Sequence, residues 1–318
     1  MNVFLLILGL VLVIVGADAL VNGSVAVAKR YRMPEFLIGL TVVGIGTSLP
    51  ELVVSLIAGI EDKGGMAIGN VVGSNLSNTL LILGAAALIQ PISISRSTQR
   101  IDIPYNMLVT LVLLIMCFGF AFWQHPAGGT ITRWEGILLL GLFVGYMVYS
   151  FRTADREEAD PKKESTPPRA LWKALLLIVA GLAGLVAGGR WFVTGASGVA
   201  AALGISETVI AITIVAVGTS LPELATAIVA SLKGNSQLAL GNIIGSNIFN
   251  ICLILGLSSV IAPLDAASIR LADIAAPLVS TLLLWLSVYT FRGRCINRAD
   301  GALFLAFYAG YIVYLVLR

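Results

Sequence analysis

The chain has 318 residues, of which 58% are hydrophobic and only 12% are charged, and its formal net charge is +3. So apolar a composition excludes a water-soluble globule with a polar surface and predicts a protein that lies in a lipid bilayer. The small positive charge does not call for a nucleic-acid partner, because the basic residues are distributed by membrane side.

Apolar segments of about 17 to 25 residues recur along the chain, and this is the length that an α-helix needs to cross the hydrocarbon core. They lack the alternation, in stretches of about ten residues, that a transmembrane barrel shows. The first segment has no basic start and no small-residue cleavage site, so we interpret it as a helix rather than a secretory signal. We predict ten helices, near residues 3–28, 36–60, 65–89, 103–122, 134–151, 170–198, 206–232, 237–262, 274–291 and 300–317.

The loops between the predicted helices differ in charge. Taken alternately, they place 15 basic residues on one side of the membrane and four on the other. Basic residues gather on the cytoplasmic side, so the first set is expected to be cytoplasmic and both termini to lie outside.

A hydrophilic stretch at residues 152–169 separates five predicted helices from five others. It contains five acidic residues, five basic residues and three prolines, and it is interpreted as a cytoplasmic linker because it is too polar to form a core. Residues 1–151 and 170–318 would each form one repeat, and an odd number of helices gives the two repeats opposite orientations. The predicted fold class is an all-α membrane protein of two inverted five-helix repeats.

One motif occurs in both halves of the chain. Gly-Thr-Ser-Leu-Pro-Glu at residues 46–51 recurs unchanged at residues 218–223, an offset of 172. At the same offset, 24 of 54 positions are identical between residues 38–91 and residues 210–263. The identical residues are mostly polar or helix-breaking, which indicates a duplication that kept two copies of one site.

Pro50 has no N–H group for the carbonyl of Gly46, and its ring crowds that carbonyl, so the second helix should break there. A broken helix is tolerated at membrane depth only where it lines a wet cavity or the protein interior. Thr47, Ser48 and Glu51 would add two hydroxyl groups and a carboxylate to the break. The second copy would face the first near the midplane with Thr219, Ser220 and Glu223.

A second motif, Gly-Asn-x-x-Gly-Ser-Asn-x-x-Asn, follows the first in each half. On a regular α-helix, Asn70, Ser74 and Asn78 would form one polar stripe beside a stripe of glycines that lets another backbone approach. The second copy repeats the stripe with Asn242, Ser246 and Asn250. These stripes predict either polar ligands or, taken alone, helix-to-helix adhesion.

Carboxylate, hydroxyl and amide oxygens are ligands that hard cations prefer, and Ca2+ takes about six to eight of them. No His lies in a predicted helix and no Cys lies beside the motifs, which disfavours a softer metal. The alternative is that Glu51 and Glu223 are protonated buried acids without a function. A charged carboxylate at the bilayer centre costs at least about 2.5 kcal/mol, so a binding role is favoured. No phosphate-binding loop or nucleophile with a base indicates an enzyme.

The doubled motifs resemble the α-repeats of the sodium/calcium exchanger family, in the bacterial branch of the cation/calcium antiporters, and the resemblance covers the whole chain. It implies a secondary antiporter that exchanges Ca2+ for Na+ by alternating access. It also implies a multi-pass protein of a prokaryotic inner (plasma) membrane that needs no cofactor. The sequence leaves the oligomeric state open, and a monomer is one form it allows. Matching positions imply the ion ligands Thr47, Ser48, Glu51, Ser74, Asn78, Thr219, Ser220, Glu223, Ser246 and Asn250, with backbone ligands near Gly44 and Ala216.

Asn250 departs from the family pattern, because many of these exchangers carry Asp at this position. The site then has two carboxylates rather than three, which still neutralise one Ca2+. A Ca2+/H+ antiporter, with Glu51 and Glu223 trading protons for the ion, is the nearest alternative, and a cation channel is a further one. The hydroxyl and amide ligands favour Na+, because a proton needs only the carboxylate.

Two patterns concern the first and sixth helices. Asp18 and Arg190 are equivalent in the two repeats, and we expect each to reach toward the headgroups rather than pair with the other. Glycine also recurs every seventh residue in both helices. We expect these smooth faces either to pack statically or to slide across the ion-binding helices. The glycines are Gly9, Gly16 and Gly23, followed by Gly181, Gly188 and Gly195.

Overall fold

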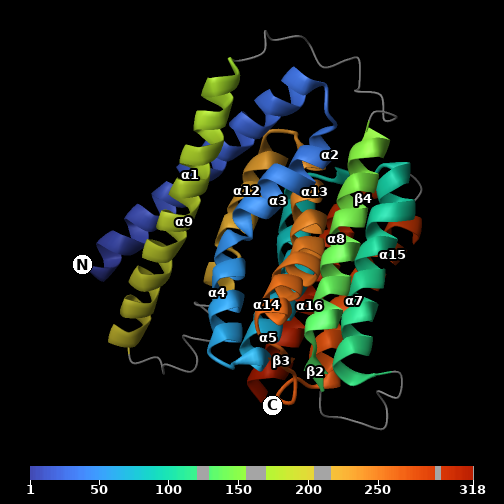
Figure 1. Ribbon diagram of the computed structural model, residues 1–318. Helices are drawn as coiled ribbons and strands as arrows, with labels where there is room; N and C mark the ends of the chain where they lie inside the picture. Colours follow the sequence, from blue (N-terminus) through green and yellow to red (C-terminus); the bar gives the residue numbers. More distant parts are fainter. Residues whose placement is uncertain (120–128, 155–169, 204–215, 291–294, 318) are drawn as a thin grey trace.

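The computed structural model describes residues 1–119, 129–154, 170–203, 216–290 and 295–317. Nearly all of these residues are helical, and the helices are gathered into one bundle (Figure 1). In chain order, with η for a π-helical segment, the helices are α1 (Asn2–Tyr31), α2 (Glu35–Ile38), η1 (Gly39–Val43), α3 (Gly44–Thr47), α4 (Leu49–Ile60), α5 (Gly64–Leu76), η2 (Ser77–Ile82), α6 (Leu83–Ile89), η3 (Thr98–Asp102), α7 (Ile103–Phe118), α8 (Arg133–Ala154), α9 (Leu171–Ala202), α11 (Ala216–Thr219), α12 (Leu221–Leu232), α13 (Ser236–Ile248), η5 (Phe249–Leu255), α14 (Gly256–Ile261), α15 (Leu271–Thr290) and α16 (Arg298–Leu317).

Seven helices in the described part of the chain are long and apolar enough to cross a membrane, and the bent pair Glu35–Thr47 and Leu49–Ile60 would be an eighth. The prediction of a mostly helical membrane protein is therefore confirmed, while the number of ten spans stays a prediction. Most of the linker 152–169 and the start of the predicted helix 206–232 lie outside the described residues.

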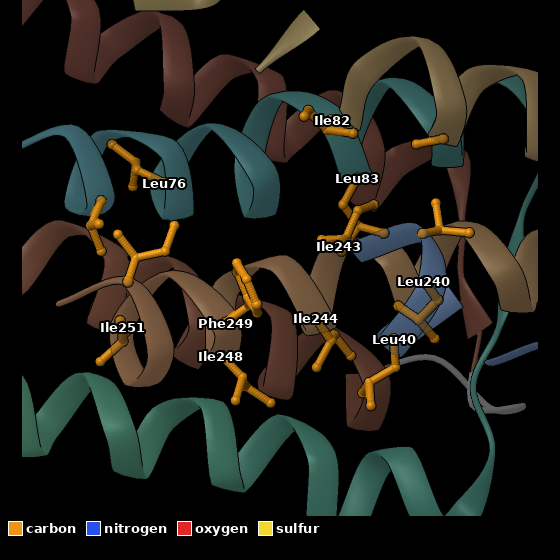
Figure 2. Packing of buried hydrophobic residues seen from close by; sticks show 14 of the residues in the cluster. Leu40, Leu76, Ile82, Leu83, Leu240, Ile243, Ile244, Ile248, Phe249 and Ile251 are labelled. Atoms are coloured by element: carbon orange, nitrogen blue, oxygen red, sulfur yellow. The ribbon is translucent and has the colours of Figure 1, made fainter. Parts of the chain in front are cut away.

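Two equivalent spans form the centre of the bundle. The most apolar stretch of Ser236–Ile261 is 83% buried inside the protein and that of Gly64–Ile89 is 72% buried, against 28% for α1. Polar side chains on these two spans are therefore shielded from lipid as well as from water. Figure 2 shows the apolar side chains of this core, among them Leu40, Leu76, Ile82, Leu83, Ile243, Ile244, Ile248 and Phe249.

Two short antiparallel ribbons join loops of the first and second halves of the chain. β1 (Ile92–Ser93) pairs with β4 (Cys295–Ile296), and β2 (Thr130–Ile131) pairs with β3 (Leu264–Asp265). The two ribbons lie at opposite ends of the bundle (Figure 1). The sequence did not predict them, because two-residue strands are too short to show an alternating pattern.

Helices α1 and α9 pack against each other as a crossed pair, on the left of Figure 1. Their glycine stripes face each other: a Cβ atom at Gly16 would lie 2.8 Å from the carbonyl oxygen of Gly181, and one at Gly188 would lie 2.8 Å from that of Gly9. Backbones come this close only where no side chain intervenes. The glycine faces therefore contact each other rather than the ion-binding helices, which corrects the expected partner. Sliding of α1 and α9 stays a prediction.

Asp18 of α1 forms an ion pair that the sequence analysis did not predict. Its Oδ1 lies 2.6 Å from the Nζ of Lys233, the residue after α12, and Asn22 bridges the two groups. Asp18 therefore reaches a protein partner rather than the headgroups alone. Arg190, its equivalent in the other repeat, is exposed on α9.

Candidate ion-binding site

The second predicted helix breaks at the place that Pro50 indicates. Helix α3 ends at Thr47, Ser48 has φ −84° and ψ 8°, and α4 starts at Leu49 after a bend of 48°. Pro50 then lies in the first turn of α4, where its missing N–H group costs no hydrogen bond. Thr47, Ser48 and Glu51 are at most 1% exposed beside the break.

The second repeat has the same break. Ser220 separates α11 from α12 with φ −87° and ψ 8°, close to the angles of Ser48, and a proline again occupies the first turn of α12. Glu223 is fully buried, and Thr219 is partly buried at the end of α11. Ala216, an expected backbone ligand, begins α11. Equivalent residues therefore build equivalent breaks in both repeats.

The two breaks meet inside the protein. Ser48 donates through Oγ to Oε1 of Glu223 at 3.1 Å, although the two residues belong to different repeats. The hydroxyl groups of Ser74 and Ser220 lie 3.5 Å apart, again across the repeats. Glu51 lies in the first turn after the break of the first repeat, as Glu223 does in the second. We call this group the central cluster, which comprises Thr47, Ser48, Glu51, Ser74, Asn78, Ser220, Glu223, Ser246 and Asn250.

Two further asparagines, Asn75 and Asn247, contact the central cluster. Asn78 donates through Nδ2 to Oδ1 of Asn247 at 3.1 Å, and Asn250 donates through Nδ2 to Oδ1 of Asn75 at 3.0 Å. Adding 172 to the numbers of Asn75 and Asn78 gives Asn247 and Asn250, so the two bonds are equivalent in the two repeats. The sequence analysis missed Asn75 and Asn247, because on a regular helix they lie beside the polar stripe. Their recurrence at the common offset was the signal that could have found them.

The predicted polar stripe on a regular α-helix does not hold along its whole length. The π-helical segments η2 and η5 begin at the equivalent residues Ser77 and Phe249, and they contain Asn78 and Asn250. A π turn changes the direction in which the residues after it point, and such turns are frequent at functional sites. Asn70 donates to Oγ of Ser55 at 3.1 Å and to the backbone carbonyl oxygen of Glu51 at 3.4 Å.

Several hydrogen-bonding groups of the site are already paired. Thr47 donates to Oδ1 of Asn242 at 3.2 Å, and Ser246 donates to the backbone carbonyl oxygen of Gly44 at 3.3 Å. The carbonyl of Gly44, an expected ligand, therefore has a protein partner. Asn250 donates a second bond to Oγ of Ser74 at 3.3 Å, which links the asparagines to the serines.

Other buried atoms of the cluster have no hydrogen-bond partner within the described residues. They are both carboxylate oxygens of Glu51, Oε2 of Glu223, and Oδ1 of Asn78 and of Asn250, while the neighbouring Asn242 has an unpaired Nδ2. Each unpaired buried group costs about 1 to 3 kcal/mol, and such groups are rare in proteins. All five unpaired atoms of the central cluster itself are oxygens. A partner that satisfies them together must be a donor or a cation.

The ligand types point to a hard cation. Within the described ranges, no group of three or more His, Cys, Asp or Glu side chains is placed to hold a metal ion. A cation at the cluster would depend on two carboxylates with amide and hydroxyl oxygens beside them. Ca2+ and similar hard cations prefer this set, whereas softer metals prefer sulfur or imidazole.

The chain belongs to the sodium/calcium exchanger family, whose model matches residues 1–152 and 173–317. It is therefore a membrane exchanger rather than an enzyme. Among its relatives, the putative antiporter CaxA of Alkalimonas amylolytica is 40% identical, over 98% of this chain and 97% of that protein. The sodium/calcium exchanger MaX1 of Methanosarcina acetivorans is 35% identical, over 99% of this chain and 98% of that one.

The fold also matches solved structures of an exchanger. The sodium-calcium exchanger NCX_Mj, soaked with 10 mM Na+ and 10 mM Sr2+, superimposes with a TM-score of 0.83 and 33% identity, over 98% of this chain and 97% of that chain. A form soaked with 10 mM Na+ and no Ca2+ gives a TM-score of 0.84. These likenesses show a multi-pass membrane protein that shares the architecture of an exchanger.

Proposed function

We propose that this protein is a secondary antiporter that moves Ca2+ in exchange for Na+. The observation that carries the proposal is the set of five buried, unpaired oxygens in the central cluster. A bound cation is a partner that buried oxygens of this kind would accept. Ca2+ suits the set because it accepts about six to eight oxygens in flexible geometry.

Glu51 and Glu223 would supply the charge, since two carboxylates neutralise one divalent cation. Asn78 and Asn250 would add amide oxygens. A serine that donates its hydrogen to a carboxylate, as Ser48 does to Glu223, still has lone pairs for a cation. The remaining proposed ligands are the hydroxyl groups of Thr47, Thr219, Ser220, Ser74 and Ser246, with backbone carbonyls near Gly44 and Ala216.

The proposed architecture is ten helices in two inverted repeats, residues 1–151 and 170–318, with both termini outside and residues 152–169 cytoplasmic. In such transporters, broken helices from the two repeats enclose an ion site near the membrane midplane, and one repeat rocks against the other to expose it alternately. Cross-repeat bonds such as that between Ser48 and Glu223 support this arrangement. The location would be the inner membrane of a prokaryote.

A Ca2+/H+ antiporter is the second candidate, because two buried carboxyl groups can trade protons for a divalent cation. The hydroxyl and amide oxygens around Glu51 and Glu223 favour Na+ instead. A proton would bind to a carboxylate alone, and the two asparagine oxygens would then have no part in the exchange.

Purified protein in Na+-loaded vesicles tests the proposal through its Ca2+ uptake. A Na+/Ca2+ antiporter uses the outward Na+ gradient to concentrate Ca2+ inside the vesicles, and a proton ionophore does not abolish this uptake. A Ca2+/H+ antiporter instead loses uptake with the ionophore, and a channel only equilibrates Ca2+. Ca2+ uptake that does not depend on the Na+ gradient would refute Na+ coupling.

A further inference from the structure

Asn75 and Asn247 have no assigned role, yet both are buried against the proposed ion ligands. They are 3% and 2% exposed. Each uses its Oδ1 to accept the amide N–H of an asparagine from the other repeat, Asn250 for Asn75 and Asn78 for Asn247. The two bonds have nearly equal lengths, 3.0 and 3.1 Å, so the contact is made twice.

The side-chain amide of Asn75 can take only one orientation. Its Nδ2 donates to the backbone carbonyl oxygen of Asn247 at 3.1 Å, and a carbonyl oxygen only accepts hydrogen bonds. Oδ1 of Asn75 must therefore point the other way, toward Asn250. Asn250 has to meet this acceptor with its Nδ2, which leaves its own Oδ1 facing away from Asn75.

Asn247 makes the equivalent contact with Asn78. Nδ2 of Asn247 donates to Oγ1 of Thr79 at 2.9 Å, and its Oδ1 receives the Nδ2 of Asn78 at 3.1 Å. A hydroxyl group can also donate, so the bond to Thr79 does not fix the orientation of Asn247 in the way that the backbone carbonyl fixes that of Asn75. The Oδ1 of Asn78 is left without a partner, as is the Oδ1 of Asn250. In each repeat, the ligand asparagine thus gives its N–H group to an asparagine of the opposite repeat and keeps its own Oδ1 free.

We propose that Asn75 and Asn247 are positioning residues that make Asn250 and Asn78 present oxygen, rather than N–H, to the transported cation. An amide offers an acceptor in one orientation and two donors in the flipped one, and donors repel a cation. The inference rests on the proposed ion site and adds a specificity device to it. Orientation by a neighbouring hydrogen bond is a general way of tuning metal ligands.

The device is needed because residue 250 is an amide. A carboxylate presents oxygen in either orientation, so Asn250→Asp removes the need for Asn75. In that variant, Oδ1 of Asn75 faces another oxygen instead of an N–H group. Asn75 should then be neutral or unfavourable for ion binding, whereas in the parent it is required.

A double-mutant cycle on the purified full-length protein tests this, with Ca2+ affinity measured by equilibrium titration. Asn75→Ala should weaken Ca2+ binding by about 10- to 100-fold, the usual effect of losing a residue that orients a metal ligand. The same change made together with Asn250→Asp should cause no loss relative to Asn250→Asp alone. Asn247→Ala combined with Asn78→Asp repeats the cycle in the other half, and decides the question if Asn75→Ala fails to fold.

Asn106→Ala is the matched control, because Asn106 is 1% exposed and hydrogen-bonded to Thr281, outside the central cluster. It should leave Ca2+ affinity unchanged. An equal loss from Asn75→Ala in both backgrounds would overturn the proposal and leave Asn75 a structural role. If Asn75→Ala and Asn250→Ala both leave Ca2+ affinity unchanged, the proposed ion site fails instead.

Discussion

Glu51 and Glu223 occupy equivalent positions in the two repeats but have different surroundings. Glu223 accepts a hydrogen bond from Ser48, whereas neither carboxylate oxygen of Glu51 accepts one within the described residues. Both side chains are fully buried. The protein alone therefore leaves Glu51 the less satisfied of the two carboxylates, with two of the five unpaired oxygens of the central cluster.

We expect Glu51→Gln and Glu223→Gln each to abolish Ca2+ exchange while the protein still inserts into the membrane. Either change leaves one negative charge to offset a divalent ion in a site of low dielectric. Ca2+ flux in vesicles measures the effect. Glu135→Gln, the same substitution at the start of α8, should exchange normally. Near-normal flux by either site variant would contradict the ion-ligand assignment.

At the scale of the elements, hydropathy and proline predicted most of the helical plan. Bilayer thickness fixes how long an apolar segment must be, and Pro50 broke its helix at the residue that its missing N–H group indicates. The residues of the first motif and the Asn78 and Asn250 pair were also identified from the repeat.

The sequence could not predict features that depend on contacts between elements. The π-helical segments at Ser77 and Phe249 are local distortions that no hydrophobic period signals. The pairing of Asp18 with Lys233 joins residues far apart in the chain. The partner of the glycine stripes was wrongly predicted for the same reason, because a smooth face shows that something comes close but not which helix it is.

Helices α1 and α9 should separate if a side chain enters between them. We expect Gly16→Ala to lower stability by about 1 to 3 kcal/mol, the usual cost of overpacking, because the new Cβ would lie 2.8 Å from backbone atoms of α9. Thermal unfolding in detergent measures the loss. Gly141→Ala in α8 is the control, since its Cβ would meet nothing within 4 Å. Equal stabilities of the two variants would show that the contact between α1 and α9 can accommodate the added methyl group.

At the scale of the whole molecule, the repeat relates two oppositely charged pairs. At the offset of 172, Asp18 is equivalent to Arg190, and Glu61 is equivalent to Lys233. Here Asp18 pairs with Lys233 at 2.6 Å, while Glu61 pairs with its neighbour Lys63 at 2.7 Å. If alternating access exchanges the surroundings of the two repeats, Arg190 and Glu61 would meet as Asp18 and Lys233 part.

Cross-linking tests this exchange of partners. A protein with Arg190→Cys and Glu61→Cys should react with a short thiol cross-linker only under Na+ and Ca2+ conditions that populate the opposite state. The pair Asp18→Cys and Lys233→Cys should react in the state described here. Each ion pair is partly exposed and contributes about 0 to 1 kcal/mol. Removing it should therefore not hold the protein in one conformation. Failure of the first pair to cross-link under all ion conditions would contradict the exchange.

The two β-ribbons imply that the covalent linker is not what keeps the halves together. Each ribbon pairs a strand of residues 1–151 with a strand of residues 170–318, and bonds such as that from Asn78 to Asn247 cross the same boundary. Two separately encoded polypeptides that end at 151 and begin at 170 should therefore assemble when they are co-expressed. They should co-purify and restore Ca2+ exchange, and recovery of only single, inactive halves would show that the connection at residues 152–169 is required. The gene could then be divided at the segment that encodes residues 152–169, and the two halves would still assemble into one exchanger.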